Sequence, residues 1–463
     1  MLTKTDFLHY LETPLHLWAE RHNRLEVQAP TPFQQRLFQQ GQQVEDLAHE
    51  FLSTRGEGSE LQRQVRLVDG QFEAWLDYLL YDSEAGVYDL YEVKSGTSLN
   101  KEHEYDLAFQ ALVCSANLPM RDYYLVLVNR EYVRYGAIDR RQFFKLEKLN
   151  EKLKILREEV LVRRQHALET AQQKEPDGLQ GCSAPDSCPC PTLCHPDLPQ
   201  YPIYDLPRLG KKALELKAMG VTAIEDIPDA FPLSDTQRAY AELVMGGRPQ
   251  IDIPGIRQQL AELEYPLYFL DYETVNPALP LFDGYHPYDL VVFQYSLHML
   301  ERPDAELQHY ECLVLEADNP APKLVNALVN VLGPHGSVMV WNRSFEERCN
   351  RTMAQQAPEY TDFLEGVNAR LFDLMNIFSK HYYLHPDFHG STSLKRVLPV
   401  LAPDLDYNQL EIQDGEQAMQ AWWEVVFGEL LPSKRFQKER ALLAYCKQDT
   451  LAMVAIWREL AGL

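Results

Sequence analysis

The 463-residue sequence lacks the long apolar runs of a membrane protein, because no stretch approaches the roughly 20 apolar residues of a membrane span. No basic and apolar leader opens the chain, so we expect a cytoplasmic protein without a membrane partner. Positive charge is also scarce: 44 Lys and Arg face 68 Asp and Glu, a formal net charge of −24. This balance argues against passive coating of nucleic acid. It does not exclude an enzyme that binds divalent ions through clustered carboxylates, because a bound ion reverses the sign of the local electrostatic field.

One segment opposes this trend. Residues 130–165 hold eleven Lys and Arg against six acids. Such a segment is typical either of a face that follows a phosphate backbone or of a solvated amphipathic helix.

Cysteine is sparse and unevenly placed. Of eight cysteines, four form the pattern Cys182-x5-Cys188-x-Cys190-x3-Cys194 within a Pro-rich loop. In a reducing compartment this cluster predicts metal binding rather than disulfides. The candidates are an iron–sulfur cluster and Zn²⁺, and Cys188-Pro189-Cys190 is tighter than the Cys-x2-Cys spacing of zinc knuckles, which favours [4Fe–4S]. The scattered cysteines predict buried thiols: Cys114, Cys312, Cys349 and Cys446.

The first 165 residues mix helical and strand patterns, and the sequence shows no internal repeat of fixed period. Apolar periodicity predicts helices over 32–53 and 102–116, a β-hairpin over 72–81 and 87–95, and a buried strand over 123–128. From Phe143 onward, leucines at three- and four-residue spacing predict one long helix.

The predicted hairpin carries an acidic signature, Asp77 followed fifteen residues later by Glu92-Val93-Lys94. Glu92 and Lys94 share a face of their strand, and the preceding strand can bring Asp77 beside them, whereas Asp89 falls on the other face. Two carboxylates with a lysine suit Mg²⁺ or Mn²⁺ and phosphodiester chemistry. An exposed hairpin with a surface ion pair is the alternative.

The order of these elements resembles the restriction-endonuclease-like PD-(D/E)xK core, particularly its RecB-type branch, which includes the CRISPR spacer-acquisition nucleases. The resemblance covers about residues 1–195. It implies a nuclease in which Gln110 is the branch's helix glutamine and Glu45 is a metal ligand, with His49 one turn later as the alternative. It also implies an iron–sulfur cluster with one cysteine near the N-terminus, where Thr13 stands in this chain, so that Cys190 becomes the replacement ligand.

The C-terminal part carries a second acidic set on separate segments. Asp271 and Glu273 follow an apolar strand at 265–270, Glu346 follows a second strand at 338–342, and Tyr445 and Asp449 lie one turn apart on a predicted helix. Four carboxylates from dispersed segments suit a two-metal site. Each motif alone is also common in proteins that bind no metal, and Asp373 is either an additional carboxylate or a helix cap.

Together these residues resemble the ribonuclease-H-like DEDD 3′→5′ exonucleases of the tyrosine subtype. The middle motif here reads Asn342-x-x-Phe345-Glu346, so a glutamate replaces the usual aspartate. The blocks "YFLDYETVNPALPLFDGYHPYDLVVFQYSLH", "WNRSFEE", "HPDFHGSTSLKRVLP" and "LLAYCKQDTLAMV" are also similar to a bacterial family of unknown function that joins these two domains. Lys395 and Arg343 are the candidate substrate contacts.

We therefore expect an α/β multidomain protein, with a restriction-endonuclease-like core and a ribonuclease-H-like mixed sheet with flanking helices. The expected parts are a nuclease domain (1–170), a cysteine loop (171–200), a helical connector (201–255) and an exonuclease domain (256–463). The expected function is divalent-metal-dependent hydrolysis of DNA, mainly single-stranded, at two nuclease heads. The alternatives are one inactive head that serves as a binding or assembly module, and a zinc-stabilised adaptor without catalysis.

Overall fold

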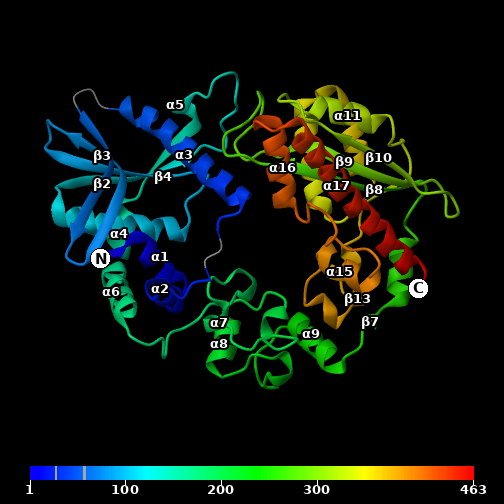
Figure 1. Ribbon diagram of the computed structural model, residues 1–463, viewed down its shortest axis with the longest axis horizontal. Coiled ribbons are helices and arrows are strands. Elements are labelled where there is room, and N and C mark those ends of the chain that lie inside the picture. Colours follow the sequence, from blue (N-terminus) through cyan, green and yellow to red (C-terminus); the bar gives the residue numbers. More distant parts are fainter. Residues whose placement is uncertain (27–28, 56–58) are drawn as a thin grey trace. The chain divides into compact units, whose positions relative to one another are not determined.

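The computed structural model describes residues 1–26, 29–55 and 59–463, which form two compact units. Unit 1 comprises Met1–Leu198 and Pro277–Tyr288, and unit 2 comprises Pro199–Asn276 and Asp289–Leu463. Helices and strands are mixed in both units (Figure 1), so the predicted α/β multidomain class is confirmed. No helix among the described residues has the length and apolar character that crossing a membrane requires.

Unit 1 is built on a six-stranded sheet in which β3 is the most connected strand. The order is β1-β3-β4-β5-β6, and β2 also pairs with β3. Its helices and strands are β1 (Leu2–Thr3), α1 (Lys4–Glu12), α2 (Pro14–Arg21), α3 (Pro32–Ser53), β2 (Ser59–Asp69), β3 (Phe72–Asp82), β4 (Val87–Lys94), α4 (Lys101–Asn117), β5 (Met120–Val128), α5 (Arg140–Phe143), β6 (Phe144–Lys148), α6 (Asn150–Gln172) and α7 (Pro191–Cys194).

Both faces of this sheet are covered, because alternate residues of β5 enter different cores. Leu125 and Leu127 pack with α1, α4 and α6, whereas Val126 and Val128 pack with α3. This alternation follows the two-residue period of a strand. The predicted hairpin, the helices at 32–53 and 102–116, and the strand at 123–128 are confirmed within a few residues.

The long helix predicted from Phe143 is wrong at its start. Residues Phe144–Lys148 form β6, which pairs antiparallel with β5, and α6 begins only at Asn150. Leu146 faces the α3 side of the sheet. Hydrogen bonding to the open edge of β5 therefore determines the structure of this segment, although its leucines have helical spacing.

Unit 2 contains a five-stranded mixed sheet in the order β10-β9-β8-β11-β12. The first three strands along the chain are antiparallel neighbours, and β11 and β12 run parallel to β8. Its elements are α8 (Lys212–Ala218), α9 (Asp235–Gly246), β7 (Gln250–Ile251), α10 (Ile253–Leu260), β8 (Leu267–Val275), β9 (Val291–Leu300), β10 (Gln308–Leu313), α11 (Ala321–Val329), β11 (Ser337–Val340), α12 (Arg343–Gln356), α13 (Thr361–Asn368), β12 (Leu371–Asp373), α14 (Asn376–Ser379), β13 (Tyr383–Leu384), α15 (Leu394–Leu401), α16 (Gly415–Phe427) and α17 (Pro432–Ala461).

The two compact units divide the chain differently from the predicted domains at one segment. The segment Pro277–Tyr288, which connects β8 to β9, belongs to unit 1 and not to the C-terminal domain predicted over 256–463. Arg134 explains this placement, because its Nη1 donates to the carbonyl oxygens of Pro280 and Leu281 at 2.7 and 2.8 Å. Tyr288 donates to the carbonyl of Ser95 at 2.7 Å. The segment therefore carries hydrogen bonds that its sequence did not indicate.

Candidate active sites and metal centre

The acidic site of unit 1 lies where β3 and β4 run side by side. Asp77 Oδ2 accepts a hydrogen bond from the backbone N–H of Val93 at 2.9 Å, which places Asp77 beside Glu92. Lys94 Nζ lies 2.9 Å from Glu92 Oε1 and 2.5 Å from Asp106 Oδ2. The structure therefore brings the predicted Asp77, Glu92 and Lys94 together.

Gln110 joins this site through Asp106, because its Nε2 donates to Asp106 Oδ1 at 2.7 Å. Glu92 Oε2 and Gln110 Oε1 are buried and have no hydrogen-bond partner within the described chain. Buried oxygens of this kind are costly unless a donor or a cation satisfies them. The donor set therefore fits a divalent cation.

Lys4 is a member of this site that the sequence analysis missed. Its Nζ lies 2.6 Å from Glu92 Oε1 and 3.8 Å from Asp106 Oδ1. Burial raises the pKa of Glu92, but the ammonium groups of Lys94 and Lys4 outweigh burial and lower it to about 2. Burial, followed by the charge of Glu92, raises the pKa of Asp77 to about 7. No local pattern signals Lys4, since 88 residues separate it from Glu92.

Glu45 is engaged elsewhere. Its Oε1 lies 3.1 Å from Arg63 Nη2 on β2 and accepts from Gln64 at 2.9 Å. The ring of His49 stacks on Tyr78 at a centroid distance of 5.7 Å. No interaction joins Glu45 to Asp77 or Glu92 in the parts of the chain that the structure describes, so its role as a metal ligand stays a prediction.

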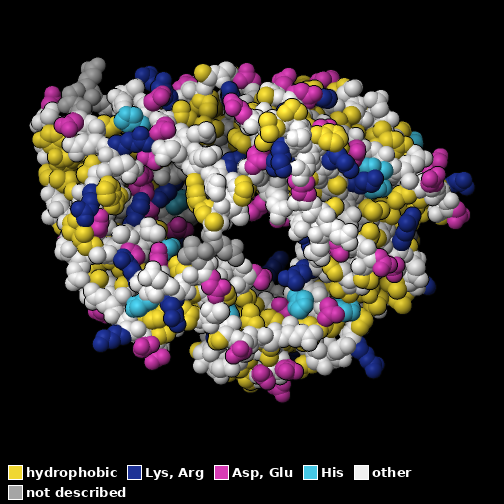
Figure 2. Space-filling view, viewed as in Figure 1, with side chains coloured by type: hydrophobic (Ala, Val, Ile, Leu, Met, Phe, Trp, Pro, Cys, Tyr) yellow, Lys and Arg dark blue, Asp and Glu magenta, His cyan; other side chains and the backbone are white. Residues whose placement is uncertain are grey.

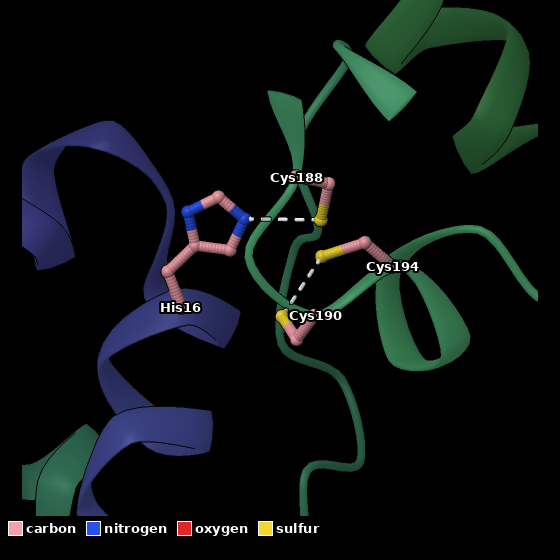
Figure 3. A group of neighbouring side chains, drawn as sticks. All are labelled: His16, Cys188, Cys190 and Cys194. Atoms are coloured by element: carbon pink, nitrogen blue, oxygen red, sulfur yellow. Dashed lines mark hydrogen bonds between the residues drawn. The ribbon is translucent and has the colours of Figure 1, made fainter. Parts of the chain in front are cut away.

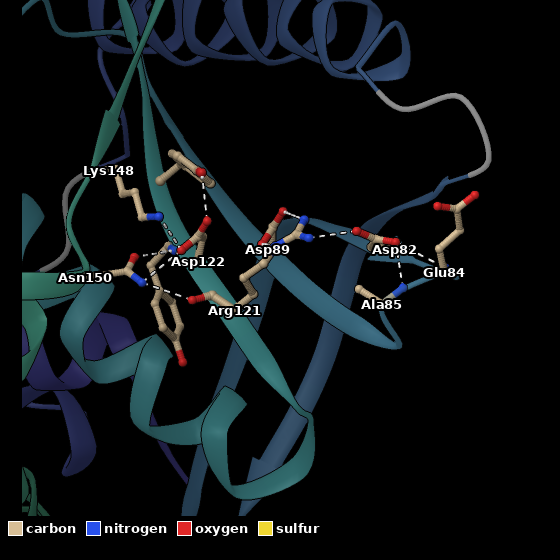
Figure 4. A network of polar contacts seen from close by, with 10 residues as sticks. Asp82, Glu84, Ala85, Asp89, Arg121, Asp122, Lys148 and Asn150 are labelled. Atoms are coloured by element: carbon tan, nitrogen blue, oxygen red, sulfur yellow. Dashed lines mark hydrogen bonds and ion pairs between the residues drawn. The ribbon is translucent and has the colours of Figure 1, made fainter.

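The basic segment at 130–165 is largely neutralised. Arg140 pairs with Glu50, Lys148 with Asp122, Lys152 with Glu104 and Arg164 with Asp69. Figure 4 shows the Lys148–Asp122 pair beside a second one, in which Arg121 binds the buried Asp89 through two nitrogens. This pair gives Asp89 a structural role and agrees with its predicted position away from Lys94. Over the face drawn in Figure 2, acidic and basic side chains are interspersed.

Three cysteines of the cluster, Cys188, Cys190 and Cys194, lie beside His16 of helix α2, as Figure 3 shows. Cys190 Sγ and Cys194 Sγ lie 3.6 Å apart, and Cys188 Sγ lies 3.5 Å from Nε2 of His16. One donor atom from each of His16, Cys188, Cys190 and Cys194 lies within 4.8 Å of the others. Cys182 Sγ lies 3.0 Å from Nε2 of His195. None of the four predicted cysteines forms a disulfide within the described residues.

His16 and His195 are potential ligands that the sequence analysis missed. The position predicted to replace a cysteine, Thr13, instead donates to the carbonyl of Gln180 at 2.5 Å. His16 lies three residues later in the same segment, one helical turn away, and is 3% exposed. The four thiols suffice for [4Fe–4S], whereas His16 with Cys188, Cys190 and Cys194 provides a Cys3His set for Zn²⁺. The residues present fit a thiolate-bound metal of either kind.

The acidic site of unit 2 brings together four carboxylates, of which Glu273, Glu346 and Asp449 are buried and Asp271 is half-buried. Asp271 and Glu273 lie on β8, Glu346 in the first turn of α12 and Asp449 on α17. Burial raises the pKa of Asp271 well above its usual range, and Asp449, Glu273 and Glu346 raise it further. Burial also raises the pKa of Glu346 to about 8 and that of Asp449 to about 6. These couplings show that the predicted carboxylates share one electrostatic environment.

No lysine or arginine forms an ion pair with these four carboxylates in the described part of the chain. Glu346 Oε2 is buried without a hydrogen-bond partner there, and Cys446 Sγ lies 3.7 Å from Asp271 Oδ2. Burial and the adjacent Asp271 raise the pKa of the Cys446 thiol, which favours its neutral form. Buried anions without a counter-charge are strongly unfavourable. This donor set also fits divalent cations.

Two tyrosines hold Asp449. Tyr407 donates to Asp449 Oδ1 at 2.5 Å, and burial raises the pKa of Asp449 although the two tyrosine hydroxyls and Lys395 partly offset this rise. Burial and the charge of Asp449 raise the pKa of both hydroxyls, so both are protonated donors at neutral pH. Tyr407 was missed, because it lies in an irregular loop without a recognisable motif.

The two predicted substrate contacts differ in their surroundings. Lys395 Nζ donates to the carbonyl of Gln413 and lies 5.5 and 5.4 Å from the ring centroids of Tyr407 and Tyr445. Lys395 also lowers the pKa of Asp449 and that of Glu273, against burial in each case. Arg343 is bound to Glu347 at 2.7 Å and to backbone carbonyls, so its substrate contact stays a prediction. Asp373 accepts from the backbone N–H groups of Arg343 and Met375, and its charge adds to burial in raising the pKa of Glu346.

Part of this chain is similar to a described family. Residues 268–393 match the family model described as "Domain of unknown function (DUF2779)". The "Uncharacterized protein MG366 homolog" of Mycoplasma pneumoniae is 27% identical over 211 residues, 42% of this chain and 32% of that protein. The "Uncharacterized protein UU173" of Ureaplasma parvum serovar 3 is 23% identical over 283 residues, 55% of this chain and 40% of that protein.

The chain thus spans between a third and two fifths of the length of these curated relatives. No solved structure matches the chain.

Proposed function

We propose that the protein is a divalent-metal-dependent nuclease that hydrolyses phosphodiester bonds of DNA, mainly single-stranded. The observation that carries this proposal is the set of four carboxylates in unit 2, three of them buried and Asp271 half-buried, contributed by β8, α12 and α17. Their burial without an ion-paired cation fits a site for two divalent ions.

In this proposal Asp271, Glu273, Glu346 and Asp449 hold the ions, which supply the positive charge that stabilises a phosphoryl transition state. Tyr445 lies next to Asp449 and keeps its proton, so it orients the attacking water or stabilises the leaving oxygen by donating a hydrogen bond. Tyr407 fixes Asp449, and Lys395 binds a phosphate oxygen. The mixed sheet with flanking helices supports the ribonuclease-H-like 3′→5′ exonuclease interpretation.

Unit 1 supports a second nuclease head at Asp77, Glu92 and Lys94. The parallel β4–α4–β5 arrangement, with Gln110 on α4 and a covered sheet, supports the restriction-endonuclease-like interpretation. The cysteine cluster joins α2 to the loop after α6 and thereby stabilises this unit through a bound [4Fe–4S] cluster or Zn²⁺.

The test is a digestion assay with Mn²⁺ or Mg²⁺ on single-stranded DNA labelled separately at the 5′ and 3′ ends. Wild type, Glu92→Ala and Asp271→Ala are compared, with circular dichroism as a control for folding. If both heads are active, each substitution removes a different product ladder. If only one substitution changes the products, the other unit serves binding or assembly. Unchanged activity in both variants contradicts the proposal.

A further inference from the structure

A cavity of about 560 Å³ lies within unit 2, between the helical connector and the exonuclease core. The connector contributes residues from Pro207 to Tyr240, and the core contributes residues from Phe378 to Thr392. The volume falls in the range of roughly 300–1,000 Å³ that small-ligand sites occupy. No predicted site residue lines this cavity.

The ionisable side chains that line the cavity are all basic, apart from tyrosine, which is unusual in this acidic chain. It contains Arg208, His381 and His385 together with several hydroxyl groups, and none of its lining residues is Asp or Glu. The chain as a whole has 68 acidic residues and a net charge of −24. A cavity free of carboxylates and rich in donors selects an anion, and a guanidinium is especially suited to phosphate.

Two of the donors are held on unfavourable backbone conformations. Arg208 has φ of 52° and His381 has φ of 66°, in the left-handed region that favours glycine. Such conformations are unfavourable for residues other than glycine and persist only where the surroundings impose them. The fold therefore maintains Arg208 and His381 at the cavity against their local preference.

The connector is fixed firmly to the core at this cavity. Tyr240 donates to the carbonyl of Pro386 at 3.0 Å, and His389 Nδ1 lies 2.8 Å from Asp205 Oδ2. Gly390 passes so close to the connector that an added Cβ would lie 1.8 Å from the carbonyl oxygen of Asp205. The cavity is thus a preformed space rather than a gap beside a loose linker.

One residue of the cavity lining, Thr392, lies on a segment that leads toward the carboxylate site. Thr392 lines the cavity, and its carbonyl accepts a hydrogen bond of 3.1 Å from Trp341 Nε1, next to Asn342 at the start of α12. Lys395 lies three residues after Thr392, at most about 11 Å away along the chain. Its charge lowers the pKa of Glu273 and that of Asp449, against burial in each case. The short segment from Thr392 to Lys395 therefore connects the cavity to the carboxylate site, as a DNA strand running from that site into the cavity requires.

We propose that this cavity is a subsite for an internal nucleotide of the strand being degraded, with Arg208 bound to its phosphodiester. This inference rests on the proposed function of the carboxylate site. The connector then favours longer substrates, because only a DNA strand that extends beyond the reacting nucleotide contacts Arg208.

The test compares kcat/KM in Mn²⁺ for thymidine 5′-(p-nitrophenyl phosphate), which occupies only the reacting position, with that for a single-stranded octanucleotide. The variant is Arg208→Ala, and the matched control is Arg238→Ala, an exposed arginine on α9 outside the cavity lining. We expect Arg208→Ala to lower the ratio of octanucleotide to mononucleotide kcat/KM at least about tenfold, since one charged contact is lost, and Arg238→Ala to preserve it. An unchanged ratio in Arg208→Ala overturns the proposal.

A second measurement separates this proposal from the proposed function. Binding of a 5′-fluorescent octanucleotide to the full-length Asp271→Asn protein is followed by anisotropy in Ca²⁺, with and without Arg208→Ala. If Arg208→Ala weakens octanucleotide binding at least about tenfold, the subsite is supported. This holds even if the wild type hydrolyses no substrate, since absent hydrolysis would overturn only the nuclease proposal. Equal binding in both backgrounds overturns the subsite while leaving the digestion assay to decide the nuclease proposal.

Discussion

The Tyr407 hydroxyl donates a 2.5 Å hydrogen bond to Oδ1 of Asp449, which joins an irregular loop to the carboxylate on α17. Tyr445 lies beside it, with ring centroids 6.2 Å apart. Asp449 is therefore positioned by two tyrosines, of which only Tyr445 belongs to the motif that the sequence displays.

The two tyrosines are expected to contribute unequally to hydrolysis. Tyr445→Phe removes a proton donor next to the reacting phosphate, and we expect kcat to fall about 100-fold or more. Tyr407→Phe removes the hydrogen bond from Tyr407 to Asp449, and we expect kcat to fall about tenfold. Steady-state kinetics on single-stranded DNA in Mn²⁺ measures both. A wild-type kcat in Tyr445→Phe would exclude it from the reaction.

Binding of Mn²⁺ to unit 2 is expected to depend on Glu346 and on pH. Glu346→Gln removes a metal ligand and should weaken Mn²⁺ binding strongly. The loss should exceed the roughly 10–100-fold effect of removing a residue that only hydrogen-bonds to a metal ligand. Glu347→Gln is the matched control, because Glu347 pairs with Arg343 on the same helix. Since burial raises the pKa of Glu346 to about 8, protons compete with the ion, and affinity should rise from pH 6 to pH 8. Isothermal titration calorimetry measures both effects; equal affinities for the two variants would contradict the assignment.

Lys4 competes with any cation at the unit 1 site. Its ammonium lies 2.6 Å from Glu92 Oε1, so Lys4→Met should raise Mn²⁺ affinity there about tenfold by removing repulsion. The same change leaves Glu92 with one fewer partner and should lower the free energy of unfolding by about 1–3 kcal/mol. Titration in an Asp271→Asn background isolates this site. Weaker Mn²⁺ binding by the Lys4→Met variant would show that Lys4 organises the ligands instead.

The cysteine cluster is expected to bind [4Fe–4S] through its four thiolates. The purified protein should then be brown and contain iron and sulfide, and Cys188→Ser should lose both together with thermal stability. His16→Ala should retain the cluster, because four thiolates satisfy it. Zinc in the wild type, lost on His16→Ala, would instead identify the Cys3His set. Elemental analysis and visible absorbance distinguish the two outcomes.

Acid should destabilise unit 2 through two neutral histidines between β9, β10 and α17. Burial lowers the pKa of His298 to about 3 and that of His309 to about 4, below the value of about 6.5 in the unfolded chain. Their folded-state pKa values are lowered, so the unfolded state binds more protons below pH 6.5 and stability falls as pH falls. From pH 7 to pH 5 each histidine should cost about 2 kcal/mol.

The comparison of wild type with His309→Asn isolates this effect, since the carboxylates contribute equally to both proteins. The stability advantage of wild type should shrink by about 2 kcal/mol between pH 7 and pH 5, as measured by urea unfolding. A constant difference across this range would show that His309 is not held neutral in the folded protein.

Local sequence predicted much of the fold for a physical reason. Strand alternation and helical spacing report which side of an element is buried, and this information lies within ten or twenty residues. The hairpin carrying Asp77 and Glu92 and the helix carrying Tyr445 and Asp449 were therefore predictable. Three of the four predicted cysteines, Cys188, Cys190 and Cys194, also lie together, but His16 completes their group and Cys182 groups with Cys188 and His195.

Tertiary structure decided the features that depend on contacts between distant segments. Phe144–Lys148 became a strand because β5 offered it an open edge, and Pro277–Tyr288 joined unit 1 because Arg134 binds its carbonyls. Lys4 reached Glu92, and Tyr407 reached Asp449, across long separations. The sequence by itself thus determined the elements and their acidic motifs. Only packing determined which charges meet, because the energy of a buried charge depends on neighbours that the local sequence does not contain.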